Sequence, residues 1–259
     1  WHFGQGLHKL PSDFGKFAAD PSHPKLLDWL ASEFVRQGFS MKAIHRLIVT
    51  SQTYQLASTV APEFASSNRD ADPTNTYLWQ FPLQRLSAEP IWDSIFAAAE
   101  CLDLTVGGPS FSVGSTNRQR GRRSRREDES TESYRRAAYL TRGYSTNRDV
   151  MANFLQAFDV DDGRAPCPQR TQTVTATQGL FMMNSDEVEV ATTKFAERLQ
   201  RESNGDLSAA VDLGYRIALV RQPSDQEREH VLAYLQDNAG RLKGFAWLLF
   251  NLDEFIYIR

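Results

Sequence analysis

Residues 24–49, PKLLDWLASEFVRQGFSMKAIHRLIV, decide the fold class of this chain because they carry two complete helix patterns in succession. Pro24 suits the first turn of a helix, and Gly38 is placed to end it. Apolar residues recur at helical spacing along this first helix: Leu26, Leu27, Leu30 and Phe34. Ser40 is placed to cap a second helix, whose predicted buried side consists of Met41, Ile44, Leu47 and Ile48. The connection is so short that the two helices are expected to pack as a helical hairpin.

Helical patterns continue through the rest of the chain. Ser87 opens a third helix, with Ile91, Ile95, Ala98 and Leu102 at near-helical spacing and Gly107, Gly108 and Pro109 at its end. Further helices are expected over residues 151–158, 176–184, 188–199, 207–220, 224–237 and 241–252, and a short strand over 137–141. In the last helix the core candidates are Phe245, Leu248 and Leu249. The predicted fold is therefore mainly α: an irregular helical domain with long loops and at most a minor strand element.

Composition divides the chain into three segments. Residues 1–109 form an N-terminal helical half with a loop-rich start, residues 110–136 a flexible Arg-rich insertion, and residues 137–259 a C-terminal helical half that belongs to one domain with the first. Six arginines of the insertion precede four acidic residues: Arg118, Arg120, Arg122, Arg123, Arg125 and Arg126, then Glu127, Asp128, Glu129 and Glu132. No aromatic residue is interleaved for base stacking, so a solvated, self-neutralising loop is favoured over contact with nucleic acid.

The overall composition is that of a folded protein with an ordinary charge balance. The chain has 259 residues, of which 41% are hydrophobic, with 16 Phe and 5 Trp. A chain of this size buries roughly 73% of its unfolded surface. The formal net charge of −3 gives no overall attraction to nucleic acid or to an acidic membrane surface. No apolar run approaches the roughly 20 residues of a membrane helix, so membrane insertion is not expected.

The beginning of the chain and its two cysteines bear on its cellular context. The sequence opens at Trp1 without a methionine, which we interpret as the internal start of a larger protein, so the lack of a signal peptide does not bear on export. Cys101 and Cys167 are too few for a zinc knuckle, and the chain has no Cys-x-x-Cys-His motif for covalent haem. The two cysteines form one disulfide in an oxidising compartment, or else remain two separate buried thiols.

Four polar residues near the start of the chain form the candidate site: His2, His8, Asp13 and His23. Imidazole together with carboxylate suits a metal ion or an acid–base pair, although this spacing matches no established zinc signature. A structural role is the favoured interpretation, in which these side chains cap turns and anchor the loop to the helices. We predict no bound cofactor and no metal ion.

Other residue patterns also favour structural roles. Two acidic stretches superficially resemble calcium loops, namely Asn68, Asp70 and Asp72, and Asp159, Asp161, Asp162 and Gly163. Neither completes the EF-hand pattern, so solvated turns are predicted. Trp29 and Trp92 are expected in the core rather than in a sugar-stacking platform.

Several short motifs follow one another in a recognisable order. The first are Trp1-His2-Phe3-Gly4-x-Gly6-Leu7, Pro11-Ser12-Asp13-Phe14-Gly15, His23-Pro24-x-Leu26-Leu27-Asp28-Trp29-Leu30, and Ala43-Ile44-His45-Arg46-Leu47-Ile48 before Ser51-x-x-Tyr54. The later ones are Arg85-Leu86 with Ala88-Glu89, Gly107-Gly108-Pro109, Phe158-Asp159, Thr173 through Gln178 to Asn184, and Leu249-x-Asn251-x-x-Glu254-Phe255. Together they resemble the planctomycete PSD domain, the cytochrome-associated domain of unknown function fifteen-fifty-three. The resemblance spans most of the chain outside residues 110–133.

This resemblance implies a context rather than a reaction, and it carries over no catalytic residue. Such domains are C-terminal parts of large, exported bacterial proteins, beside upstream domains and sometimes a cytochrome c domain. We therefore expect a non-catalytic accessory or interaction module in the periplasm or otherwise exported, with upstream domains of the same polypeptide and a cytochrome domain as partners.

Two alternatives stay open, namely an extracellular carbohydrate-active enzyme and a non-covalent haem or electron-transfer module. An enzyme should have a concave pocket where histidine and carboxylate groups converge, whereas a docking module should have an exposed apolar face.

Overall fold

The computed structural model describes residues 2–8, 19–111, 134–142, 153–161, 170, 172–236 and 239–258. The chain divides into two units: unit 1 comprises Trp1–Arg85 with Tyr257–Arg259, and unit 2 comprises Leu86–Ile256. This division falls at Arg85, whereas the sequence pattern places the two halves on either side of residues 110–136. The arginine and acidic cluster of that segment lies outside the described residues.

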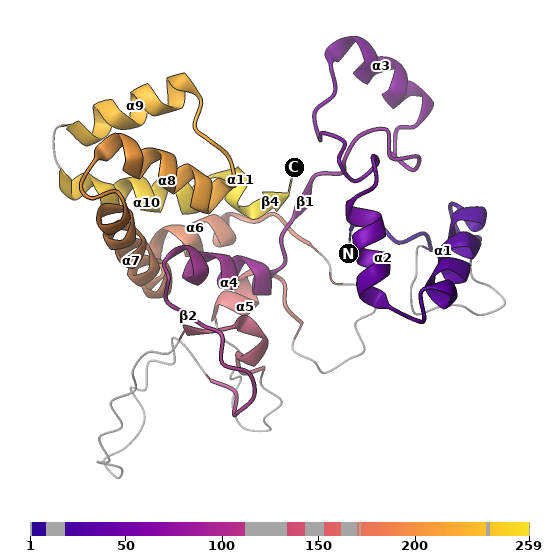
Figure 1. Cartoon of the computed structure of the whole chain (residues 1–259), viewed down its shortest axis with the longest axis horizontal. Coiled ribbons are helices and arrows are strands. Elements are labelled where there is room, and N and C mark those ends of the chain that lie inside the picture. Colours follow the sequence, from indigo (N-terminus) through magenta and orange to yellow (C-terminus); the bar gives the residue numbers. More distant parts are fainter. Residues whose placement is uncertain are drawn as a thin grey trace. The chain divides into compact units, whose positions relative to one another are not determined.

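Unit 1 contains the helical hairpin that the sequence predicts (Figure 1). Its elements are α1 (Pro24–Arg36), α2 (Met41–Val49), α3 (Pro62–Ala71), β1 (Gln84–Arg85) and β4 (Tyr257–Ile258). Gly38, at φ +64°, ends α1, since the Gly38 and Phe39 amides donate back to the carbonyls of the last helical turn. The Ser40 hydroxyl then caps α2 by accepting the Ala43 amide at 3.2 Å.

Only two-residue strands occur in the described part of unit 1. Gln84 and Arg85 of β1 pair antiparallel with Ile258 and Tyr257 of β4. The last described residues of the chain are thereby joined to a segment more than 170 positions earlier. Short elements of this kind agree with the predicted mainly α fold, in which strands are minor.

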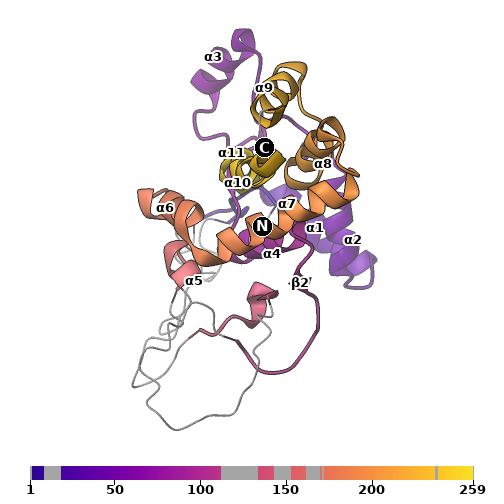
Figure 2. The same ribbon diagram turned by 90° about the vertical axis from the view of Figure 1, so that its left-hand side faces the viewer.

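Unit 2 is a helical assembly around one hydrophobic core (Figures 1 and 2). Its helices are α4 (Ala88–Ala98), η1 (Ala137–Tyr139), α5 (Asn153–Ala157), α6 (Ala176–Asn184), α7 (Asp186–Glu202), α8 (Leu207–Leu219), α9 (Asp225–Gln236), η2 (Ala239–Arg241), α10 (Leu242–Asn251) and α11 (Asp253–Ile256). Its strands are β2 (Leu102–Asp103) and β3 (Tyr134–Arg135), paired in parallel. α7 packs against α10 and α4 (Figures 1 and 2), and Phe195 of α7 stacks on Phe250 of α10 with ring centroids 5.2 Å apart.

The core candidates of the last helix are confirmed in part. Phe245 and Leu249 are fully buried in the core of unit 2, whereas Leu248 is 43% exposed. Trp92 of α4 is buried as predicted, and its indole N–H donates to the Arg135 carbonyl at 3.0 Å. This hydrogen bond satisfies the one polar atom of the ring inside the core.

The end of α4 differs from the sequence prediction. The helix stops at Ala98 instead of continuing past Leu102 to Gly107, because Glu100 takes the left-handed conformation at φ +57°. The Cys101 amide then donates to the Phe96 carbonyl, and the Glu100 amide donates to the Ala97 carbonyl. This is the Schellman arrangement, which usually has glycine at the left-handed position. Because position 100 holds glutamate instead of glycine, the sequence does not indicate that the helix ends there.

The strand predicted over residues 137–141 is also wrong. Ala137–Tyr139 form a 3₁₀ turn, and the strand pairing flanks it, at β3 before it and in a single bridge between Leu140 and Phe111 after it. The Asp93 carboxylate of α4 accepts the Ala137 amide at 2.7 Å and so holds the beginning of the turn. A side chain more than 40 positions away therefore overrides the local β pattern.

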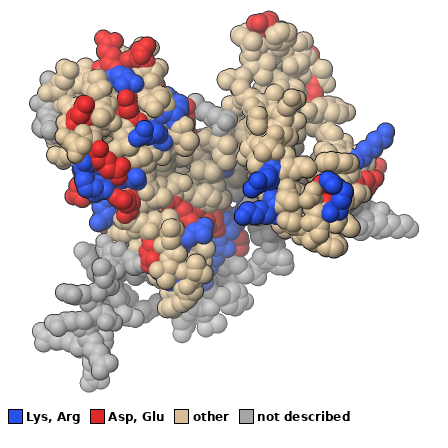
Figure 3. Space-filling view, viewed as in Figure 1, with Lys and Arg blue, Asp and Glu red and all other residues tan. Residues whose placement is uncertain are grey.

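The charged surface of unit 2 is mixed. On the face shown in Figure 3, acidic and basic side chains alternate over α8 and α9. Several of them are paired, for example Arg228 with Asp212 at 2.7 Å. None of the helices in the described part of the chain is long and apolar enough to cross a membrane.

We predict that Gly214→Ala destabilises the protein whereas Gly179→Ala does not. A Cβ atom at Gly214 of α8 would lie 2.7 Å from the Phe245 ring, so the core must shift, at a cost of about 1–3 kcal/mol. Gly179 of α6 has open space around it, and alanine there gains up to about 1 kcal/mol of helix propensity. Urea unfolding of both variants measures the difference. Equal stability of the two variants would contradict the close approach of α8 to α10.

Candidate functional site

Unit 1 has very little hydrophobic core of its own. Among its described residues, Phe81 is the one hydrophobic side chain that is fully buried, whereas the buried cluster of unit 2 extends from Ala88 to Phe255. Phe81 belongs to a small aromatic group, in which its ring meets Tyr54 edge-on at 5.4 Å and Phe3 at 6.2 Å. Isolated short helices are marginal in water without tertiary packing, so the faces of α1 and α2 lack the burial that usually stabilises such helices.

The apolar side chains of the hairpin are largely exposed. We call five of them the hairpin apolar surface, with these exposed fractions: Leu26 43%, Leu27 40%, Trp29 50%, Phe39 66% and Met41 58%. The prediction that Trp29 lies in the core is wrong. Leu30, Phe34, Ile44, Leu47 and Ile48 are half-buried, so the two helices cover each other in part and leave the edges of their apolar faces open.

A charged residue occupies the most buried position of α1. Glu33 is 6% exposed, and its carboxylate accepts from Arg36 Nε at 2.7 Å and from Gln37 Nε2 at 2.7 Å. The hydrogen bonds from Arg36 and Gln37 lower the pKa of Glu33, so the carboxylate stays charged at neutral pH. Arg36 and Gln37, at the end of the same helix, therefore supply the hydrogen bonds that this buried carboxylate needs.

His2 of the predicted site meets a histidine that the sequence analysis did not select. His2 Nε2 lies 3.0 Å from His45 Nδ1, where His45 is on α2. The His2 ring also meets the Tyr54 ring at 6.2 Å, and Gln84 Nε2 donates to the His2 carbonyl at 3.1 Å. Burial and the neighbouring His45 lower the pKa of His2, so its neutral form is favoured.

The other members of the predicted site have different surroundings. His23 precedes α1, with its Nδ1 2.9 Å from the Ser22 hydroxyl and its ring edge-on to Tyr77 at 5.6 Å. His8 also lies within the described part of the chain and makes an interaction of its own. Asp13 lies outside the described residues. His2 and His23 thus have different partners in unit 1.

His45 and Tyr54 belong to one of the family motifs, but nothing in the sequence around them indicates a binding or catalytic site. His45 stands on the more exposed side of an amphipathic helix, next to Arg46, where a polar residue is expected in any case. Its sequence distance from His2 is 43 positions, so only tertiary structure brings the two rings together. In the described part of the chain, no group of three or more His, Cys, Asp or Glu side chains is arranged to hold a metal ion.

The two acidic stretches act as turn anchors where they are described. The Asp72 carboxylate accepts the Tyr77 amide at 2.8 Å and the Thr76 amide at 3.0 Å. The Asp159 carboxylate accepts the Thr173 amide at 2.9 Å and the Thr173 hydroxyl at 2.6 Å. In both cases protein donors occupy oxygens that a calcium ion would need, which agrees with the turn interpretation. Asp162 and Gly163 lie outside the described residues.

The cysteine prediction is not tested, because Cys167 lies outside the described residues. Cys101 follows α4 and is half-buried. Burial raises the pKa of its thiol, so it is not an activated nucleophile. The disulfide between Cys101 and Cys167 stays a prediction.

Two arginines of unit 2 converge on a glutamate in the first turn of α4. Arg170 Nη1 lies 2.8 Å from one carboxylate oxygen of Glu89, and Arg142 forms a short ion pair with the other. Burial opposes the charge on Glu89, but the hydrogen bonds to its carboxylate and the charges of Arg170 and Arg142 together outweigh burial and lower the pKa of the carboxyl. The arrangement joins three segments far apart in sequence through charge pairing.

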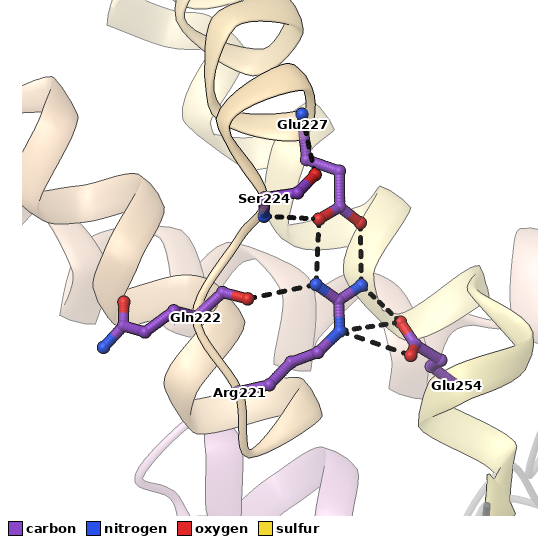
Figure 4. Close-up of polar contacts among 5 residues, drawn as sticks. All are labelled: Arg221, Gln222, Ser224, Glu227 and Glu254. Atoms are coloured by element: carbon purple, nitrogen blue, oxygen red, sulfur yellow. Dashed lines mark hydrogen bonds and ion pairs between the residues drawn. The ribbon is translucent and has the colours of Figure 1, made fainter.

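Another ion cluster of unit 2 surrounds Arg221, in the loop between α8 and α9 (Figure 4). Its guanidinium donates to both carboxylate oxygens of Glu227, at 2.7 and 2.8 Å, and to Glu254 of α11 at 2.6 Å. Glu227 also accepts the Ser224 amide at 2.7 Å, while the Ser224 hydroxyl accepts the Glu227 amide at 3.3 Å. This reciprocal pair is a capping box at the beginning of α9, a helix that the sequence predicts over residues 224–237. The cluster ties α9 to α11 and has a structural role.

Comparison with known proteins identifies the family to which the chain is similar. The family model described as "PSD1: Protein of unknown function (DUF1553)" matches residues 1–235. A search of curated proteins found no significant match. A search of solved structures likewise found none.

We predict that Glu227→Gln weakens the protein at neutral pH and flattens its response to acid. The Arg221 guanidinium lowers the pKa of Glu227 from 4.5 to about 2, so the folded protein keeps this charge where the unfolded chain takes up a proton. The stabilisation is therefore present above about pH 4.5 and is lost as the pH falls toward 2. The loss at pH 7 should be roughly 1–2 kcal/mol, since bidentate charged hydrogen bonds are broken.

Urea unfolding at several pH values between 7 and 2.5 measures this effect. Asp225→Asn is the matched control, because it removes an exposed carboxylate from the same helical turn. If the Gln variant at position 227 lost stability on acidification as steeply as the wild type, the Arg221 cluster would not be the source of that loss.

Proposed function

Because the chain belongs to the PSD1 family of proteins of unknown function (DUF1553), we propose that it is a non-catalytic interaction module of a larger, exported bacterial protein. In this proposal the hairpin apolar surface of unit 1 docks onto a preceding domain of the same polypeptide. A docking module needs an exposed apolar face, and the hairpin apolar surface supplies one.

The observation that carries the proposal is that α1 and α2 have the apolar pattern of helices with a buried face, whereas many of those apolar side chains are exposed. The five side chains of the hairpin apolar surface are 40–66% exposed. Exposed apolar surface of this kind on a folded protein is often a site of interaction with a partner. Trp is, moreover, one of the residue types that dominate binding energy in protein interfaces, and Phe and Met are enriched in interface cores.

An enzymatic role receives less support from the described residues. A carbohydrate-cleaving enzyme needs two carboxyl groups on either side of a bound sugar. An open depression on unit 2 is lined by Asp225, Arg228, Glu229, Leu232, Ala233 and Gln236. All of these residues come from α9, so the depression offers one wall and not a two-sided groove.

The wider context of the proposal is the one that the sequence resemblance implies. It comprises a periplasmic or otherwise exported location and a neighbouring cytochrome c domain in some proteins of this kind. An oxidising compartment would also allow the predicted disulfide between Cys101 and Cys167.

We predict that Leu26→Asp releases the module from its neighbouring domain and that Val35→Asp does not. The two positions are nine residues apart on α1, which places them on opposite sides of the helix, and both side chains are exposed. Leu26 belongs to the hairpin apolar surface, so a charge there should weaken docking by about tenfold or more.

The full polypeptide, cut at a protease site engineered before Trp1, provides the measurement. Size-exclusion chromatography then gives the fraction of the two pieces that stays together, and circular dichroism checks that both variants are folded. The proposal expects the wild type and the Val35 variant to stay associated. Separation of the wild-type pieces, or equal behaviour of the two variants, would refute docking through this surface.

A further inference from the structure

Two imidazole nitrogens of unit 1 lie at the separation of neighbouring ligands on one metal ion. His2 Nε2 and His45 Nδ1 are 3.0 Å apart, and the two rings are tilted by 42° with centroids 5.0 Å apart. Histidine nitrogens lie about 2.0–2.1 Å from a bound zinc ion, so two of them on adjacent coordination positions are roughly 3.0–3.4 Å apart. The observed separation falls in this range without any movement of the backbone.

From this geometry we propose that His2 and His45 form a binding site for a divalent transition-metal ion, with Cu²⁺ the preferred ion and Zn²⁺ the next. Imidazole nitrogen suits both ions, and copper binds most tightly among the divalent first-row metals. Two protein ligands leave the remaining coordination positions to water or to a group from a partner. The site is independent of the hairpin apolar surface and of the docking function.

The protonation state of the pair is suitable for binding a metal ion. A histidine must be neutral to coordinate, because the lone pair of the ligating nitrogen has to be free. Burial and the adjacent His45 lower the pKa of His2, which increases the neutral fraction at pH 7. Without a metal ion, the two facing nitrogens share one proton in a hydrogen bond, and a second proton between them would turn two N–H groups toward each other at 3.0 Å.

Surrounding residues hold both rings in place. His45 is fixed on α2, a regular helix with a capped beginning. His2 is held by the hydrogen bond from Gln84 to its carbonyl and by the edge of the Tyr54 ring. Gly4, at φ +72°, lets the chain pass close to Gln84, where a Cβ atom would lie 3.1 Å from the Gln84 side chain. The ligands are thus preorganised, which lowers the entropic cost of binding.

The experiment titrates CuCl₂ and then ZnCl₂ into the untagged, EDTA-treated protein at pH 7.5 by calorimetry. The protein carries two extra residues before Trp1, so that a terminal amino group next to His2 does not contribute a ligand. The expected result is one Cu²⁺ ion per chain, with nitrogen hyperfine splitting from imidazole in the electron paramagnetic resonance spectrum.

Four variants identify the ligands. His2→Ala and His45→Ala should each weaken Cu²⁺ binding by a factor on the order of ten or more, since one imidazole of the two is lost. His45→Gln keeps a hydrogen-bonding side chain beside His2 but removes the imidazole, so it should weaken copper binding while the fold is retained. His23→Ala is the matched control, because His23 contacts Ser22 and Tyr77, and it should change the affinity less than about twofold.

The possible outcomes separate cleanly. Copper binding that is lost in the His2 and His45 variants and kept in the His23 variant supports the site. The absence of copper binding by the wild type would mean that the pair is only a hydrogen bond, and would overturn the proposal. Binding of equal strength in His45→Gln and the wild type would overturn it as well, because the ion would then be held elsewhere.

Discussion

The packing of α10 against α7 and α8 is the interaction on which the rest of unit 2 depends. Phe250 of α10 stacks on Phe195 of α7, and both rings are fully excluded from water. On the other side, Gly214 lets α8 approach so closely that a single methyl group would overlap the Phe245 ring. Interiors are packed as densely as organic crystals, so this closeness fixes the positions of three helices at once. The ion pairs of Arg221 and the hydrogen bonds of Asp93 are added around that core.

Unit 1 follows a different balance of forces. Its helices are well started and well ended by Pro24, Gly38 and Ser40, yet the described part of the unit buries one hydrophobic side chain fully. Capping contributes about 1 kcal/mol per site, whereas the burial of one large apolar side chain contributes about 1.5–3 kcal/mol. The residues at the helix ends therefore define the hairpin. Burial of its exposed apolar side chains against a partner would add a stabilisation that unit 1 lacks by itself. This difference is the physical basis of the proposal that unit 1 is the part of the molecule that binds a neighbouring domain.

Polar side chains serve two purposes in the described residues. Two carboxylates of the acidic stretches that resemble calcium loops are occupied by protein donors: Asp72 accepts backbone amides, and Asp159 accepts the Thr173 amide. The His2–His45 pair differs, because a tautomer change in the donor ring frees both facing nitrogens as neutral ligands for a metal ion. A polar contact between two neutral ligands is thus a better candidate for function than the stronger ion pairs.

The sequence by itself determined the mainly α class, the family and most helix boundaries, because helical periodicity, N-terminal caps and the capping box of Ser224 and Glu227 are local properties. It did not determine where α4 ends, since the left-handed turn at Glu100 has no glycine to announce it. Only the tertiary structure decided that Trp29 is exposed while Trp92 is buried, although both lie on helices with apolar neighbours. Only the tertiary structure, likewise, brought His45 to His2. Burial and pairing depend on what lies opposite a helix face, and residues far apart in the chain supply that.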